Sequence, residues 1–228
     1  MTRLGDSLEG RRVLVTQALD FIGPALVEGF LEHGAIVATG EDPLTEPGAA
    51  EELVRSAGRV DVLVVNLSCP APATPAVDVR DDEWRAVFAH LVDPLPRLVR
   101  AVLPQMTERR AGKVIVMGSA SALRGMRRTS TYSAARGAQV AYVRAVGTEV
   151  APQGVQVNLI AQNFVENDQY FPEEVRTLPA FQERLRREVP AQRLGTPSED
   201  AMLAIFLASD ECRFMVGQSV PFAGGWVT

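Results

Sequence analysis

The chain has 228 residues, a formal net charge of −5 and a pI near 5.2. That length suits one domain, residues 1–228, with a full hydrophobic core, and an acidic chain lacks the basic surface on which nucleic-acid binding depends. The longest apolar runs are far shorter than the roughly 18 residues of a membrane-spanning helix, and the N-terminus has no signal-peptide pattern. We therefore expect a cytoplasmic protein with neither nucleic acid nor a membrane as partner.

Short runs of β-branched residues bounded by turn residues predict six strands. In chain order they span residues 11–16, 35–39, 61–66, 113–118, 155–160 and 218–222. Helical patterns lie between them at residues 22–33, 48–57, 81–108, 131–151 and 198–209, the last with Ser198 as expected N-cap. Because the strands are nearly continuous apolar runs, we expect helices on both faces. The pattern predicts an α/β fold with a single doubly wound, Rossmann-like parallel sheet.

The segment from 161 to 179 is long and irregular, and it directly follows the predicted fifth strand. Ligands in this architecture bind outside the carboxyl ends of the strands, so this segment is predicted to contribute to a binding site. Cys69, Cys212, His33 and His90 lack metal-ligand spacing. We interpret these four as ordinary core and helix residues and expect no metal.

Two residue types are scarce, which limits the candidates for catalysis. Lys113 is the only lysine among the 23 basic residues, and tyrosine occurs only at positions 132, 142 and 170. Tyr132 and Arg136 share one face of a helix, and Ser119 ends a predicted strand. A nearby cation favours the ionised form of a phenol, which can then act as a general base while a serine hydroxyl holds the substrate oxygen. Taken alone, the tyrosine and arginine are more typical of a solvent-exposed pair on a helix.

Further stretches accompany this spacing: TYSAAR (131–136), NLIAQN (158–163), QRLGTPSEDA (192–201), FLASDE (206–211) and GQSVPFAGGW (217–226). With Ser119 they resemble the short-chain dehydrogenase/reductase superfamily along essentially the whole chain. The active site of that superfamily reads serine, tyrosine, lysine, whereas the lysine position here is Arg136. Arginine at this position is typical of the halohydrin dehalogenases, a branch that uses no cofactor. The resemblance implies Ser119, Tyr132 and Arg136 as the catalytic residues.

The turn after the first predicted strand departs from the nucleotide-binding pattern. Glycines in this turn normally let the backbone approach a pyrophosphate. Here the turn reads TQALDFIG from Thr16 to Gly23, with Gln17 and Phe21 at two of the glycine positions. We expect the Phe21 ring to obstruct a dinucleotide, because a purely structural role in the core would leave the missing glycines unexplained.

The junction after the fifth predicted strand lacks the Pro-Gly pair of many nicotinamide enzymes. In halohydrin dehalogenases this loop and the aromatic residue of the turn form a halide pocket. By that resemblance the pocket residues are Phe21, Gln162, Asn163, Phe164 and Val165. Dehalogenases commonly carry a proline where Gln162 stands, so we expect the contacts to the halide to differ in detail.

Two further departures concern the cofactor and the proton relay. Six predicted strands are one fewer than the superfamily's seven, which implies that a βα unit near the adenine-ribose site is lost. The relay asparagine of the superfamily also appears replaced, with His90 near its place. We interpret His90 as a packed helix residue and expect no nicotinamide cofactor.

The resemblance implies a cofactor-independent halohydrin dehalogenase that converts vicinal halohydrins to epoxides and opens epoxides with halide, azide, cyanide or nitrite. Its partners would be these small molecules and further copies of the chain in a homotetramer. Trp226 is expected either to pack under its own sheet or to reach a neighbouring subunit's active site. Two alternatives stay open: an NAD(P)-dependent oxidoreductase with an atypical glycine turn, and a catalytically silent scaffold of the same fold.

Overall fold

The computed structural model describes residues 8–227 and confirms the predicted α/β fold. Six parallel strands form one sheet in the order β2-β1-β3-β4-β5-β6. The strands are β1 (Arg12–Val15), β2 (Ile36–Thr39), β3 (Val62–Asn66), β4 (Gly112–Ser119), β5 (Val155–Gln162) and β6 (Ser219–Phe222). The principal helices are α1 (Gly23–Glu32), α2 (Ala49–Ala57), α3 (Asp81–Leu91), α4 (Pro94–Arg109), α5 (Ser130–Val150), α6 (Glu173–Arg176), α7 (Pro179–Glu188) and α8 (Pro197–Ala208).

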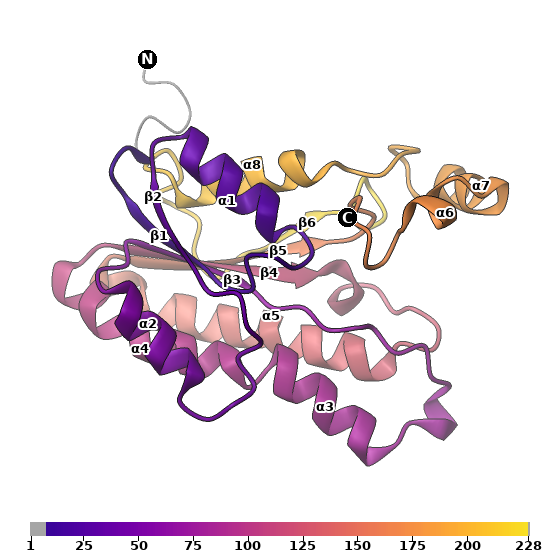
Figure 1. Cartoon of the computed structure of the whole chain (residues 1–228), viewed down its shortest axis with the longest axis horizontal. Helices are drawn as coiled ribbons and strands as arrows, with labels where there is room; N and C mark the ends of the chain where they lie inside the picture. Colours follow the sequence, from indigo (N-terminus) through magenta and orange to yellow (C-terminus); the bar gives the residue numbers. More distant parts are fainter. Residues whose placement is uncertain (1–7, 228) are drawn as a thin grey trace.

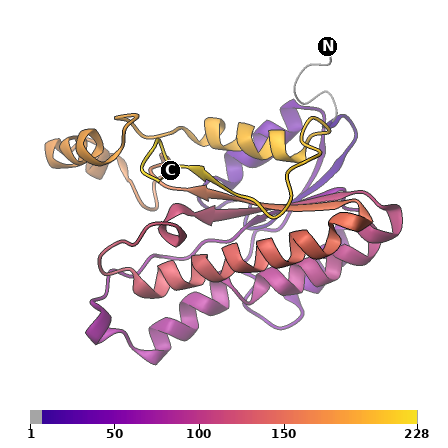
Figure 2. The same cartoon turned by 180° about the vertical axis from the view of Figure 1, so that it is seen from behind.

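Helices cover both faces of the sheet (Figure 1). The helices α1 and α8 pack on one face around residues such as Phe30 and Ile205, while α2, α4 and α5 cover the other. Alternate residues of the central strands point into the two cores, with Val114 and Val116 in one and Ile115 in the other. Figure 2 shows α5 running along its face of the sheet. This arrangement holds the carboxyl ends of β4 and β5 rigidly beside the start of α5.

The segment between 81 and 108, predicted as one helix, forms two. Pro94 and Pro96 lack the N–H groups that would bond back to the carbonyls of His90 and Val92, so α3 ends at Leu91 and Pro94 begins α4. The N-cap prediction for the last helix was also wrong. Thr196, rather than Ser198, accepts the N–H of Glu199 in a capping box.

The predicted irregular segment contains helical turns. It includes α6 and runs into α7, and Figure 1 shows both helices projecting beyond the sheet. A small apolar cluster with Phe164 and Trp226 holds this projection against the carboxyl edge of the sheet. No helix in residues 8–227 has the length and apolar composition that crossing a bilayer requires.

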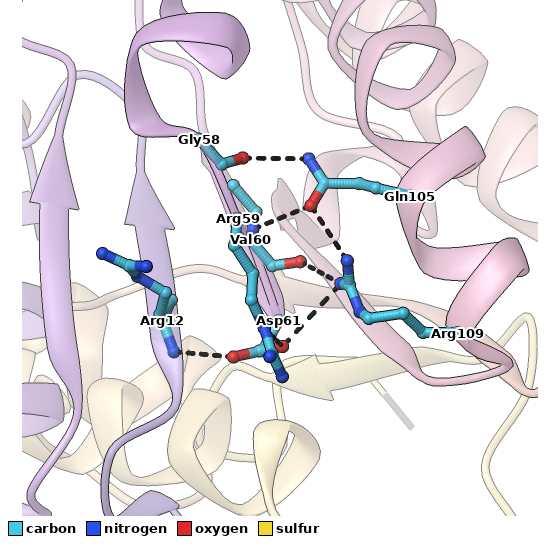
Figure 3. A network of polar contacts seen from close by, with 7 residues as sticks. All are labelled: Arg12, Gly58, Arg59, Val60, Asp61, Gln105 and Arg109. Carbon is cyan, nitrogen blue, oxygen red and sulfur yellow. Dashed lines mark hydrogen bonds and ion pairs between the residues drawn. The ribbon is translucent and has the colours of Figure 1, made fainter.

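A polar network fastens the amino end of β3 to its neighbours (Figure 3). The buried carboxylate of Asp61 accepts the backbone N–H of Arg12 and the Arg59 Nε–H, both at 3.0 Å. Gln105 donates to the Gly58 carbonyl at 3.1 Å and accepts the Val60 N–H at 3.0 Å. The network therefore joins β1, β3 and α4 through bonds that satisfy both ends of an amide and a carboxylate.

Lys113 also lies at this amino edge. It is the second residue of β4, at the opposite end of the strand from Ser119. Its ammonium donates to the side-chain oxygen of Gln156 and to the carbonyls of Ser209 and Cys212, which follow α8. The only lysine of the chain thus ties the end of a helix to the sheet. This placement confirms that it is remote from Arg136.

Candidate active site

A cavity of about 390 Å³ opens at the carboxyl edge of the sheet. Its wall contains all eight residues singled out from the sequence: Ser119, Tyr132, Arg136, Phe21, Gln162, Asn163, Phe164 and Val165. They come from the first βα turn, the end of β4, the first two turns of α5 and the end of β5 with its following loop. Parallel strands bring these sequence-distant segments together because all carboxyl ends meet at one edge.

Ser119 is held in a defined orientation at the end of β4. Its Oγ accepts the backbone N–H of Ser121 at 3.2 Å and lies 2.9 Å from the Ser121 hydroxyl. Tyr132 lies in the first turn of α5 and is 9% exposed. A phenol and a serine hydroxyl on one cavity wall can share the oxygen of a small alcohol.

Arg136 is one turn further along α5 and is almost completely buried. Its guanidinium donates to the carbonyls of Met117 at 3.1 Å and Leu67 at 3.0 Å, and its Cζ lies 5.1 Å from the centre of the Tyr132 ring. Within residues 8–227 it forms no salt bridge with a carboxylate. Burial alone would lower the pKa of Arg136, but the acidic groups of Tyr132 and Tyr170 outweigh burial and raise it. A permanently charged, buried cation therefore lies against Tyr132.

Gln139 completes the support of Arg136, and sequence reasoning did not find it. It lies one turn beyond Arg136, is fully buried, accepts from the guanidinium at 3.0 Å and donates to the Leu91 carbonyl at 2.6 Å. A glutamine at i+3 from the key arginine was the available signal. His90 does not line the cavity, and its ring nitrogen bonds the Ala86 carbonyl at 2.8 Å, as expected for a helix residue.

Tyr170 is a second residue that the sequence analysis did not assign to the site. Its hydroxyl donates to the Cys69 carbonyl at 2.7 Å, and the residue lines the same cavity as Tyr132. Its ring meets the Phe21 ring edge-on, with 5.7 Å between centroids. Burial, together with the neighbouring Tyr132, raises the pKa of Tyr170 far above the usual range. Tyr170 therefore stays neutral at working pH.

The turn between β1 and α1 keeps the backbone shape of a glycine turn without its glycines. Gln17 and Phe21 have φ angles of 43° and 55°, a left-handed conformation that favours glycine. Gln17 is buried, and its side-chain oxygen accepts the Ser68 N–H at 2.7 Å. Gly23 remains because a Cβ there would lie 2.5 Å from the Ala18 carbonyl oxygen.

Several N–H groups of the same turn are already bonded within the chain. The N–H groups of Ala18, Asp20 and Gly23 are all bonded to backbone carbonyls, and Pro24 removes another at the start of α1. Phe21 also lines the cavity, where its ring meets that of Tyr170. A dinucleotide normally relies on free N–H groups and on the close approach that glycines allow at this helix terminus, and here Gln17 and Phe21 replace two of those glycines.

The remaining titratable groups do not form a metal centre. Among residues 8–227, no three His, Cys, Asp or Glu side chains are arranged to hold a metal ion. Trp226 is 6% exposed and packs within its own chain, with its ring 5.9 Å from Phe164 and under the Arg124 guanidinium. Trp226 therefore packs within its own chain in the cluster around Phe164, and its contact with a neighbouring subunit stays a prediction.

Comparison with known proteins agrees with this architecture. The family described as enoyl-(acyl carrier protein) reductase matches residues 43–227. A 3-oxoacyl-[acyl-carrier-protein] reductase of Vibrio harveyi is 31% identical over 96% of this chain and 98% of its own. The chain belongs to the short-chain dehydrogenase/reductase superfamily.

Solved structures of a halohydrin dehalogenase and of a reductase both superpose well on this chain. A halohydrin dehalogenase bound to ethyl (2S)-oxiran-2-ylacetate is 28% identical, with a TM-score of 0.87 over 95% of this chain and 97% of that one. A 3-oxoacyl (acyl-carrier-protein) reductase of Agrobacterium tumefaciens with NADP bound is 27% identical, with a TM-score of 0.90 over 98% and 97%. Overall similarity therefore does not separate the two activities, and the residues of the site carry that decision.

Proposed function

We propose that this member of the superfamily is a cofactor-independent halohydrin dehalogenase, with a vicinal halohydrin or the corresponding epoxide as its substrate. The observation that carries the proposal is the buried Arg136 cation against Tyr132, where a reductase needs a lysine. Arginine keeps its proton at working pH, so it can stabilise a phenolate but does not relay protons as a lysine does. The obstructed turn at Phe21 supports the same proposal.

The proposed reaction starts with Tyr132 as general base. Tyr132 removes the proton of the substrate hydroxyl while Ser119 donates a hydrogen bond to that oxygen. The oxygen then forms a bond to the neighbouring carbon as the carbon–halogen bond breaks, and the bonding electron pair leaves with the halide. The products are an epoxide, a halide ion and a proton. Run in reverse, the site opens an epoxide with a small anion.

The halide is proposed to leave toward the wall formed by Phe21 and residues 162–165. Phe164 and Val165 supply apolar surface, and the side-chain NH₂ groups of Gln162 and Asn163 supply donors. A cavity of about 390 Å³ suits a small halohydrin. Closure of an epoxide within one molecule needs no second substrate and no hydride donor, which matches a site with a base, a hydroxyl clamp and an anion wall.

An NAD(P)-dependent oxidoreductase is the second candidate, favoured by the sequence similarity to 3-oxoacyl-[acyl-carrier-protein] reductases. Bromide release from 1,3-dibromo-2-propanol without added nicotinamide separates the candidates. We expect bromide release and no NADPH binding in a fluorescence titration. Stoichiometric NADPH binding with no bromide release would establish the reductase, and absence of both would leave a scaffold without this catalysis.

The role of Tyr132 gives the first prediction. Tyr132→Phe keeps the ring against Arg136 and removes the base, so bromide release should fall by about three orders of magnitude. Tyr142→Phe is the matched control, because Tyr142 lies on α5 outside the cavity and should keep wild-type rates. Bromide release by Tyr132→Phe at the wild-type rate would overturn the mechanism.

A further inference from the structure

Gln162 occupies an unusual position in the cavity. It is the last residue of β5 and lies in register with Ser119, the last residue of β4, so both side chains leave the same face of the sheet. Gln162 is 4% exposed, and neither its amide nitrogen nor its amide oxygen has a hydrogen-bond partner. A buried amide without partners is costly unless a ligand supplies them. The family resemblance implies a proline here, which has no such amide.

The neighbouring side-chain amides in the cavity lining differ from Gln162 in how many hydrogen-bond partners they have. Asn167 has both ends engaged, since it donates to the Val165 carbonyl and accepts the Tyr170 N–H, each at 2.7 Å. Asn163 is half engaged. Its oxygen accepts the Phe164 N–H at 2.9 Å, which leaves its buried NH₂ group without a partner. Gln162 and Asn163 therefore add N–H donors to this wall that nothing in residues 8–227 accepts.

The charge of the cavity favours an anion at these donors. Its lining includes Arg136 and Arg184 and, among the described residues, no aspartate or glutamate. Arg184 is partly neutralised by Glu188 at 3.1 Å, but Arg136 has only carbonyls, Gln139 and phenols around it. Donors beside a buried cation bind hydrogen-bond acceptors that carry negative charge.

We propose that the amides of Gln162 and Asn163 make this an oxyanion site, which accepts a polyatomic oxyanion such as nitrite or a small carboxylate in preference to a bare halide. The proposal rests on the proposed function, because the anion is the nucleophile that opens an epoxide there. A polyatomic oxyanion offers separate oxygen acceptors to two NH₂ groups, whereas a halide is a single sphere.

Gln162→Met tests the proposal because methionine has a similar length and shape but no donor. Binding of sodium nitrite and sodium bromide is measured by isothermal titration calorimetry at constant ionic strength. We expect the wild type to bind nitrite more tightly than bromide, and Gln162→Met to lose about tenfold in nitrite affinity with little change for bromide. Gln153→Met is the matched control, since Gln153 is exposed before β5 at the other edge of the sheet. Both affinities should stay at wild-type values there.

Opening of 1,2-epoxybutane by nitrite or bromide, measured on the same proteins, separates the two levels of the argument. Equal loss of nitrite and bromide affinity in Gln162→Met, or no loss of either, overturns the oxyanion site even if the enzyme opens epoxides. Nitrite-selective binding that depends on Gln162, without epoxide opening or bromide release, supports the oxyanion site and overturns the proposed function. Wild-type selectivity for bromide also overturns the oxyanion site.

Discussion

The two edges of the sheet each border a cavity, but the polar groups at the two edges differ in whether they have hydrogen-bond partners within the chain. At the amino edge, a cavity of about 290 Å³ is lined by Asp61, Lys113 and Asp210, and these side chains have partners within the chain. At the carboxyl edge, the amide of Gln162 and the Nε of Arg136 are buried without partners. The amino edge stabilises the fold, whereas the carboxyl edge holds groups that only a ligand can satisfy.

Left-handed backbone occurs at both edges, because Arg110, with a φ angle of 53°, lines the amino-edge cavity. Phe21 and Phe164 adopt left-handed φ angles of 55° and 56°, and both line the carboxyl-edge cavity. Such conformations cost roughly 1 to 2 kcal/mol for a residue with a side chain. At the carboxyl edge this strain coincides with unpartnered donors, a combination typical of binding sites.

The largest effect on this contrast is expected from Arg136→Lys. A single ammonium cannot donate to Met117, Leu67 and Gln139 at once as the guanidinium does. We expect bromide release to fall about a hundredfold. NADPH oxidation should not appear, because the turn at Phe21 is unchanged. Gain of NADPH-dependent reduction in this variant would show that the residue at position 136 alone separates the two activities.

Much of this site was predictable because its parts carry local signals. Strand periodicity placed the ends of β4 and β5 at one edge, and the family resemblance singled out Ser119, Tyr132 and Arg136 as the central residues. The resemblance also predicted the halide-pocket residues, Phe21 and residues 162–165. Each of these residues lines the cavity in the structure.

Other parts depended on contacts that no local pattern encodes. Tyr170 enters the cavity on a loop whose path is set by tertiary packing, and its hydroxyl bonds to the Cys69 carbonyl. Gln139 can support Arg136 because the Leu91 carbonyl lies within hydrogen-bond distance of its amide. Pro94 and Pro96 indicate a break between α3 and α4, but the continuous helical pattern around them led to the prediction of a single helix. The N-cap is Thr196 rather than the predicted Ser198, because the Glu199 carboxylate in the first turn accepts the Thr196 N–H and completes a capping box.

Asp61→Asn tests the amino edge and should change stability rather than catalysis. Burial raises the pKa of Asp61, but hydrogen bonds from the Arg12 N–H and Arg59 outweigh burial and leave the pKa below its usual range. The substitution removes a charged acceptor, so we expect the free energy of unfolding at pH 7 to fall by about 2 kcal/mol. Urea unfolding measures this, and bromide release at 25 °C should stay at the wild-type rate.

The pH dependence of this variant has a defined sign. A carboxylate whose pKa is lowered by folding stabilises the folded state above its unfolded pKa of about 4, and the stabilisation is lost as pH falls through the folded pKa. The difference between wild type and Asp61→Asn should therefore be full at neutral pH and shrink in acid. A difference that grew on acidification would contradict the ion-pair network at this edge.

The smallest predicted effect, and the one that most sharpens the role of the carboxyl edge, belongs to Tyr170→Phe. This change keeps the ring contact with Phe21 and removes the hydroxyl that donates to the Cys69 carbonyl in the cavity that Tyr132 also lines. A neutral hydroxyl can turn its proton toward a phenolate, which favours the ionised base. Bromide release should fall about fivefold at pH 7, roughly the effect of one neutral hydrogen bond, and the acidic limb of the kcat/KM profile should move to higher pH. Tyr142→Phe controls for loss of a phenol hydroxyl elsewhere, and an unmoved or opposite shift of the limb would reduce Tyr170 to a packing role.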